Sequence, residues 1–124
     1  MAAKRVLSVG QCFADHCAIA RTLQEHFGAE VVPADDAGEA LARLREETFD
    51  LVLVNRILDR DGAQGVELVK EIAADDELRR VPVMLVSNHD DSQRQAVACG
   101  AVAGFGKAAL GQPQMLGRVK RVLE

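Results

Sequence analysis

The chain contains no tryptophan and no tyrosine, and phenylalanine occurs only four times in its 124 residues. Proteins that bind single-stranded nucleic acid usually stack bases on aromatic side chains, so this composition argues against such a surface. The net charge is −4, and the charged residues are spread along the chain without a basic block. We therefore expect no nucleic-acid partner, because phosphate backbones are bound by positively charged faces.

Long apolar runs are also missing. No segment approaches the roughly 20 consecutive apolar residues that cross a bilayer. The basic residues Lys4 and Arg5 are not followed by an apolar run long enough for a secretory signal. Cysteine occurs three times, an odd number with no tight spacing, which favours reduced thiols. We expect a cytoplasmic protein with no membrane partner.

The residues that are present predict one α/β domain over residues 1–124, because the chain is long enough to bury a core and 48% of it is hydrophobic. Short apolar runs alternate with segments of helical periodicity. Strands are predicted at 6–9, 30–32, 50–54, 82–86 and 101–105. Helices are predicted at 13–27, from Asp35 or Asp36 to Leu44, at 66–73, from Asp90 or Asp91 to Ala98, and at 113–123. This alternation predicts a parallel sheet with helices on both faces.

Several helix ends carry recognisable signals. Gly28 is expected to stop the first helix in the left-handed conformation, and Pro113 to occupy the first turn of the last helix. Asp35 or Asp36 is expected to cap the second helix, and Asp90 or Asp91 the fourth. Phe13 is expected on the apolar face of the first helix, at the spacing of its other apolar residues.

Polar or glycine residues follow four of the predicted strands. They are Gly10 with Gln11, Asn55, Ser87 and Lys107. In a doubly wound parallel sheet, ligands meet the loops at the carboxyl ends of the strands. These positions therefore form the one constellation in the sequence that the fold is expected to bring together.

The pattern resembles the receiver domain of two-component response regulators over residues 4–123. The resemblance implies a flavodoxin-like, doubly wound sheet of order 2-1-3-4-5. It also implies an acidic pair after the first strand, a phosphorylated aspartate after the third, a serine or threonine after the fourth and a lysine followed by proline after the fifth. Ser87 and Lys107 match this motif.

The other motif positions depart from the family. Gly10 and Gln11 stand at the acidic pair, Asn55 stands at the phosphoacceptor and Ala108 replaces the proline. The family's switch aromatic would fall at Gly104.

Two further departures lie close to these positions. Phe105 comes one residue after the expected aromatic and should face the opposite side of its strand. The loop at residues 56–65 is about two residues longer than the common form.

These departures change the expected chemistry. An asparagine amide is a poor nucleophile toward phosphorus, and Mg²⁺ prefers anionic oxygen ligands. Three carboxylates and a lysine would give a formal charge of −2, whereas Lys107 alone gives +1. Each lost carboxylate removes on the order of several kcal/mol of attraction at about 4 Å. We therefore expect no metal, no cofactor and no catalytic residue.

Three residues are candidates for the rim of this pocket: Asp15, Asp59 and His89. Asp59, Asp61 or Asp15 could return negative charge, against the alternative that they are solvated. We expect Lys107 to hydrogen-bond Asn55, a backbone carbonyl or one of these aspartates.

The sequence thus predicts a receiver-like domain, not an enzyme, that works without phosphorylation by contact with another signalling protein, as a monomer or weak homodimer. By resemblance, the contact face is built from the fourth helix, the fifth strand and the fifth helix. Its candidate residues are Gln93, Arg94, Val97, Ala103 and Lys120.

Two other classes of function stay open. A small-anion or nucleotide module could use the Gly10 backbone with Ser87 and Lys107, because amides at a helix start favour anions. A zinc protein could use Cys12, His16 and Cys17, although Cys17 falls on the apolar helix face and no fourth ligand is evident.

Overall fold

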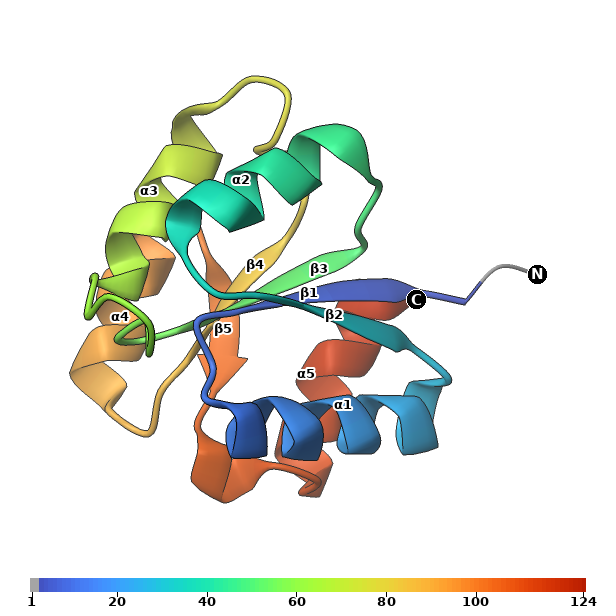
Figure 1. Ribbon diagram of the computed structural model, residues 1–124. Coiled ribbons are helices and arrows are strands. Elements are labelled where there is room, and N and C mark those ends of the chain that lie inside the picture. The colour runs from blue at the N-terminus through green and yellow to red at the C-terminus, as the bar shows by residue number, and fades with distance from the viewer. Residues whose placement is uncertain (1–2) are drawn as a thin grey trace.

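The computed structural model describes residues 3–124 as a five-stranded parallel sheet with helices on both sides (Figure 1). The strand order is β2-β1-β3-β4-β5, as the resemblance implied. The strands are β1 (Arg5–Val9), β2 (Glu30–Ala34), β3 (Leu51–Asn55), β4 (Val83–Val86) and β5 (Val102–Phe105). The helices are α1 (Phe13–Phe27), α2 (Ala37–Glu46), α3 (Gly65–Ala74), α4 (Asp90–Ala98), the short 3₁₀ helix η1 (Lys107–Ala109) and α5 (Pro113–Leu123).

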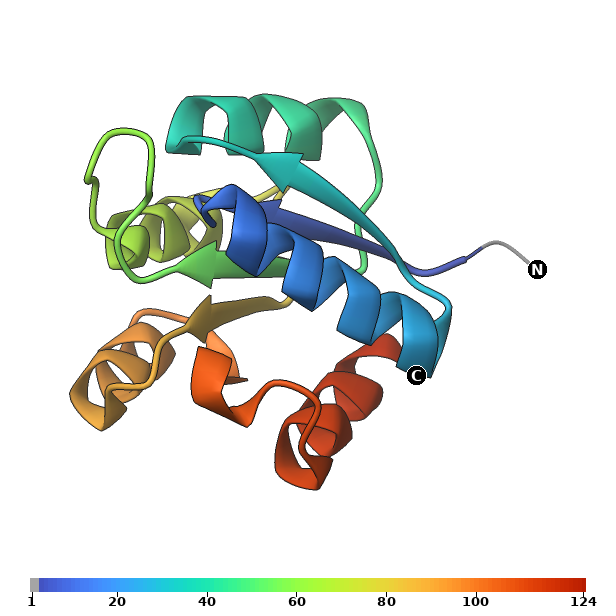
Figure 2. The ribbon, with the colours of Figure 1, turned by 60° about the horizontal axis from the view of Figure 1, so that its bottom comes forward.

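The sheet divides the core into two halves because successive side chains of a strand point to opposite faces. One half contains Leu7 and Val9 of β1 and packs under α2, α3 and α4. The other contains Val6 of β1 and packs against α1 and α5. Figure 2 shows α1 and α5 together on one side of the sheet. The strands are nearly all apolar since both of their faces are covered.

The local signals for helix ends are largely confirmed. Gly28 ends α1 with a φ of 63°, where a side chain would be strained. Of the two candidate caps for α2, Asp36 fulfils the role: its Oδ1 accepts a hydrogen bond of 2.8 Å from the Glu39 amide. Pro113 is the first residue of α5. Apart from β2 and α2, the predicted and observed bounds differ by at most one residue.

Three expectations were wrong. Strand β2 continues through Pro33 to Ala34, which is possible because β2 is an edge strand. The N-cap of α4 is His89, and Asp90 is already helical. Phe13 is 82% exposed, because α1 packs on the sheet through Ile19 and Leu23, roughly 100° around the helix from Phe13 at 3.6 residues per turn.

None of the helices in the described part of the chain is both long and apolar enough to cross a membrane.

Candidate functional site

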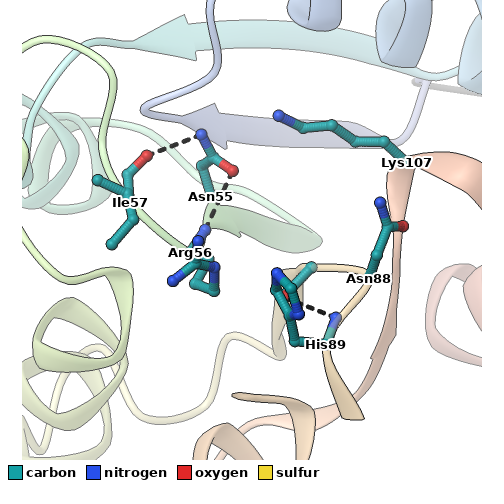
Figure 3. A pocket seen from close by; sticks show the side chains of 7 residues that line it. Asn55, Arg56, Ile57, Asn88, His89 and Lys107 are labelled. Carbon is teal, nitrogen blue, oxygen red and sulfur yellow. Dashed lines mark hydrogen bonds between the residues drawn. The ribbon is translucent and has the colours of Figure 1, made fainter. Parts of the chain in front are cut away.

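The carboxyl ends of β1, β3 and β4 lie near the start of η1 at one end of the sheet. Of the predicted constellation, Asn55, Ser87 and Lys107 line one cavity there, whereas Gly10 and Gln11 do not. This cavity has a volume of about 240 Å³. Figure 3 shows the residues at the end of β3 on one side of this cavity and those after β4 on the other. Its lining consists of Asn55, Arg56, Ile57, Ser87, Asn88, His89 and Lys107.

Asn55, the last residue of β3, is fully engaged with the backbone around it. Its Nδ2 donates to the carbonyl oxygens of Gly10, at 3.0 Å, and Ile57, at 2.8 Å. Its Oδ1 accepts from the Arg56 amide at 3.1 Å. Both amide hydrogens are thus donated to carbonyl oxygens. A carboxylate at this position has no hydrogen to donate and would repel these oxygens.

Leu58 fills the space beside the end of β1. This side chain belongs to the loop between β3 and α3, yet it is only 1% exposed and packs in the core with Val9 and Val54. Gly10 has a φ of 73°, and a Cβ atom there would overlap Leu58. A larger residue at position 10 therefore meets both an unfavourable backbone conformation and an occupied space.

The backbone N–H and carbonyl of Gly10 both form hydrogen bonds. Its N–H donates to the Ala34 carbonyl at 2.8 Å, and its carbonyl accepts from the Asp59 amide at 2.9 Å as well as from Asn55. The long loop is fixed at its outer end by Arg60, whose Nη1 lies 3.6 Å from Asp35 and 3.7 Å from Asp36. These contacts hold the loop over the end of β1.

Lys107 forms an ion pair with Asp15 of α1, with 2.6 Å between Nζ and Oδ2. This agrees with the expectation that Lys107 bonds one of the three aspartates, and Asp15 is therefore not simply solvated. The Lys107 ammonium, followed by the Cys12 thiol, lowers the pKa of Asp15. A lowered pKa in the folded state contributes stability above the unfolded pKa, and that contribution is lost as the pH falls through the folded value.

The other two rim candidates behave differently from Asp15. Asp59 is exposed, and the Asp61 carboxylate accepts from the Ala63 amide at 3.0 Å within its own turn. His89 is exposed and lines the cavity.

Asn88 holds the loop after β4 against the loop after β5, and Ser87 forms a hydrogen bond within the loop after β4. The Ser87 Oγ accepts from the His89 amide at 3.1 Å. The Asn88 Oδ1 accepts from the Ala108 amide at 3.1 Å. Asn88 also lies against Gly106, where a Cβ atom would overlap it. These contacts join two segments that are about 20 residues apart in sequence.

Gln93 of α4 bridges β4 and the edge strand β5. The pairing of β4 with β5 is irregular. Met84 pairs with Val102 and Val86 with Phe105, so two residues of β5, at positions 103 and 104, lie opposite Leu85 in a β-bulge. The Gln93 Nε2 donates to the Leu85 carbonyl at 2.9 Å, and its Oε1 accepts from the Gly104 amide at 3.1 Å. The side chain restores hydrogen bonds that the bulge removes.

Gly104 and Phe105 lie as the sequence predicted. Gly104 faces α4, under the Gln93 amide, and a Cβ atom there would overlap the Leu85 carbonyl oxygen. Phe105 is buried on the other face of the sheet with Met115 and Val119 of α5. The sequence placed Gln93 on the contact face and did not predict its hydrogen bonds to β4 and β5, although the volume left by a glycine at the aromatic position was a signal that another side chain fills it.

The predicted contact face is gathered around one groove. A groove of about 360 Å³ runs between α4, β5 and α5. Its lining includes four of the five candidate residues, Gln93, Arg94, Val97 and Ala103, but not Lys120. Lys120 lies 4.0 Å from Glu124 on α5.

Two of the zinc candidates, Cys12 and His16, lie at the start of α1. Cys12 is the N-cap residue of α1, and burial lowers the pKa of His16. Within residues 3–124, no three histidine, cysteine, aspartate or glutamate side chains are grouped as a metal ion would need.

Comparison with known proteins gives the family. The profile described as response regulator receiver domain matches residues 14–116. The chain belongs to the response regulator receiver domain family. Chemotaxis protein CheY-3 of Vibrio cholerae is 35% identical over 71 residues, 57% of this chain and 52% of that protein. Protein PilH of Pseudomonas aeruginosa is 27% identical over 86 residues, 69% of each chain.

Solved structures agree on the receiver fold. A putative response regulator from Chloroflexus aurantiacus superimposes with a TM-score of 0.87 over 98% of both chains at 20% identity, which speaks for the fold alone. A CheY-like receiver domain protein from Methanospirillum hungatei is 27% identical, with a TM-score of 0.79 over 98% of this chain and 94% of that one. The alignment to CheY-3 spans about half of that relative's length.

The residues present do not fit the divalent metal that the receiver family implies. Mg²⁺ needs hard oxygen ligands, mostly anionic, in an octahedral arrangement. At this edge of the sheet Leu58 covers Gly10, and the Asn55 amide oxygen already accepts from Arg56. The Gln11 amide is neutral, and the one carboxylate next to Lys107, that of Asp15, is paired with it.

Proposed function

We propose that this receiver is a pseudo-receiver, which signals without accepting a phosphoryl group and acts by contact with another signalling protein. The observations that carry the proposal are the hydrogen bonds of Asn55 and the packing of Leu58 against Gly10. Asn55 stands where the family has its phosphoacceptor, and its amide hydrogens are both donated to backbone carbonyls. Leu58 occupies the space beside Gly10, where the family has an acidic residue.

The contacts around the cavity support a fixed conformation. Gln93 links α4 to β4 and β5, and Asn88 links the loops that follow these two strands. Switching would require a second arrangement of comparable energy. Here the hydrogen bonds of the Gln93 and Asn88 side-chain amides would have to break together. A buried hydrogen-bonding group left without a partner costs about 1–3 kcal/mol.

The groove between α4, β5 and α5 is the contact face that we propose. Val97 and Val102 of this region are 47% and 40% exposed, and a partly apolar groove with charged edges is suited to a protein partner. Arg94 and Arg118 line it beside Asp90. We assign the domain no catalytic residue, and we place the contact in the cytoplasm since the three cysteines favour a reducing compartment.

An affinity capture tests both parts of this proposal. The wild-type domain, incubated with or without Mg²⁺ and a small phosphodonor, is expected to retain the same signalling protein from the cells that make it. Val97→Glu, in the groove, is expected to reduce retention at least tenfold, because a buried unpaired charge costs several kcal/mol. Ala42→Glu, on the exposed side of α2, is the charge-matched control.

Two outcomes would contradict the proposal. Retention that depends on the phosphodonor would show that the domain is switched by phosphorylation. Equal losses for Val97→Glu and Ala42→Glu would show that the groove is not the contact face.

A further inference from the structure

Strand β2 forms one edge of the sheet, and only one of its two sides is paired with another strand. Figure 2 shows β2 at the margin of the sheet, between α2 and α1. The backbone N–H and carbonyl groups of an edge strand can bind another extended chain. The opposite edge, β5, is covered by side chains: the Gly104 amide donates to Gln93, and the Gly104 carbonyl accepts from Arg118.

The backbone groups of β2 alternate between the side facing β1 and the outer side. The Glu30 N–H donates to the Lys4 carbonyl at 2.8 Å, and the Ala34 carbonyl accepts from the Gly10 amide at 2.8 Å. Both ends of β2 therefore face β1. Because successive residues of a strand direct their backbone groups to opposite neighbours, position 32 also faces β1, and positions 31 and 33 face outward.

The outer side of β2 lacks one donor. Val31 offers both an N–H and a carbonyl, whereas Pro33 offers only a carbonyl because proline has no backbone N–H. Pro33 is exposed, so neither α1 nor α2 covers this part of the edge. A proline within a strand is tolerated where its missing N–H would have faced solvent, and that is the position of Pro33.

The missing donor lies where it most weakens pairing with a second copy of the same strand. Two copies of β2 could pair antiparallel about a two-fold axis at Val32, which places Val31 of one copy opposite Pro33 of the other. In an antiparallel ladder, two residues opposed in this way exchange two N–H···O bonds. Here only Val31 can donate, so Pro33 removes half of the hydrogen bonds of such a dimer.

We propose that Pro33 prevents the domain from pairing with a second copy of itself through β2. An identical strand is the partner that this edge would otherwise fit, because symmetric pairing would satisfy the outer groups of both copies at once. The valines at positions 31 and 32 also favour an extended conformation. The inference goes beyond the docking role and does not depend on it.

Analytical ultracentrifugation over a wide range of concentrations tests the proposal. Pro33→Thr restores the outward N–H with a residue type that is common in strands. It is expected to make self-association at least about tenfold tighter than in the wild type, because one hydrogen bond is regained on each side of the two-fold axis. The variant should fold, since the restored N–H points to solvent and not to β1.

Glu30→Thr is the matched control. It introduces the same side chain at another exposed position of β2, but the N–H there already bonds the Lys4 carbonyl. The substitution also removes a negative charge from a chain of net charge −4, which weakens the repulsion between two copies. This variant is nevertheless expected to self-associate no more than about twofold more tightly than the wild type.

Amide hydrogen exchange locates the contact and also tests the wild-type chain alone. In the wild type, the outward N–H of Val31 is expected to exchange faster than the N–H of Val32, which faces β1. In Pro33→Thr, protection of the amides at positions 31 and 33 should rise with protein concentration.

Three results would overturn the proposal. Pro33→Thr could be as monomeric as the wild type, Glu30→Thr could associate as tightly as Pro33→Thr, or the wild-type Val31 amide could be as protected as that of Val32. None of these results bears on the groove between α4, β5 and α5, which the Val97→Glu capture tests separately.

Discussion

Replacing Leu58 by alanine is expected to lower the free energy of unfolding by about 2–5 kcal/mol. The side chain is 1% exposed and packs with Val9 and Val54, although it belongs to a surface loop. The substitution removes buried methyl groups and leaves a cavity beside Gly10. Chemical denaturation followed by circular dichroism measures the loss.

Ile57→Ala is the control from the same loop. Ile57 is partly exposed at the cavity, so its truncation should cost clearly less. A loss below about 1 kcal/mol for Leu58→Ala would mean that the loop does not hold Leu58 in the core. The same contact also limits any repair of the acidic pair: a carboxylate at residue 10 would need the loop to move, besides a left-handed backbone that costs about 1–2 kcal/mol.

Gly104→Ala is expected to destabilise the domain by at least about 2 kcal/mol. The added methyl would overlap the Leu85 carbonyl and push Gln93 from its bonds to Leu85 and Gly104. This edge of the sheet depends on Gln93 because the bulge removes direct pairing there. Thermal and chemical unfolding both report the effect, and amide exchange at Gly104 should rise.

Gly117→Ala provides a control with the opposite sign. Gly117 lies in α5, and a Cβ atom there would meet nothing within 4 Å. Alanine in a helix is favoured over glycine by about 1 kcal/mol, so this variant should be more stable than the wild type. If Gly104→Ala proved as harmless as Gly117→Ala, then Gln93 would not clamp the strands.

Much of the fold follows from local signals in the sequence. Gly28 and Asp36 act within one turn of a helix, so residue type was enough to predict the role of Gly28 and to narrow the cap of α2 to Asp35 or Asp36. The run of apolar residues in β3 predicted a strand covered on both faces. Phe13 was misplaced because its spacing fits either side of the apolar stripe, and only the packing of Ile19 and Leu23 on the sheet decides between them.

The site was predicted less completely because its key contacts join distant segments. Asn55 forms a hydrogen bond to Gly10, 45 residues earlier in the sequence. Lys107, near the C-terminus, pairs with Asp15, near the N-terminus. Leu58 was hidden in a polar loop, and its burial depends on how that loop folds back onto the end of β1. Sequence named the residues that lack carboxylates, but only the structure shows that a leucine takes up the space.

Intact-mass spectrometry of the wild-type domain after incubation with Mg²⁺ and a small-molecule phosphodonor tests the central claim most directly. A relative with the complete acidic pocket, treated in parallel, shows that the phosphodonor is active. The Asn55 amide is a poor nucleophile, and neither Gly10 nor Gln11 supplies a carboxylate. We therefore predict an unchanged mass. A gain of one phosphoryl group, mapped to the edge formed by Asn55, Ser87 and Lys107, would contradict the account.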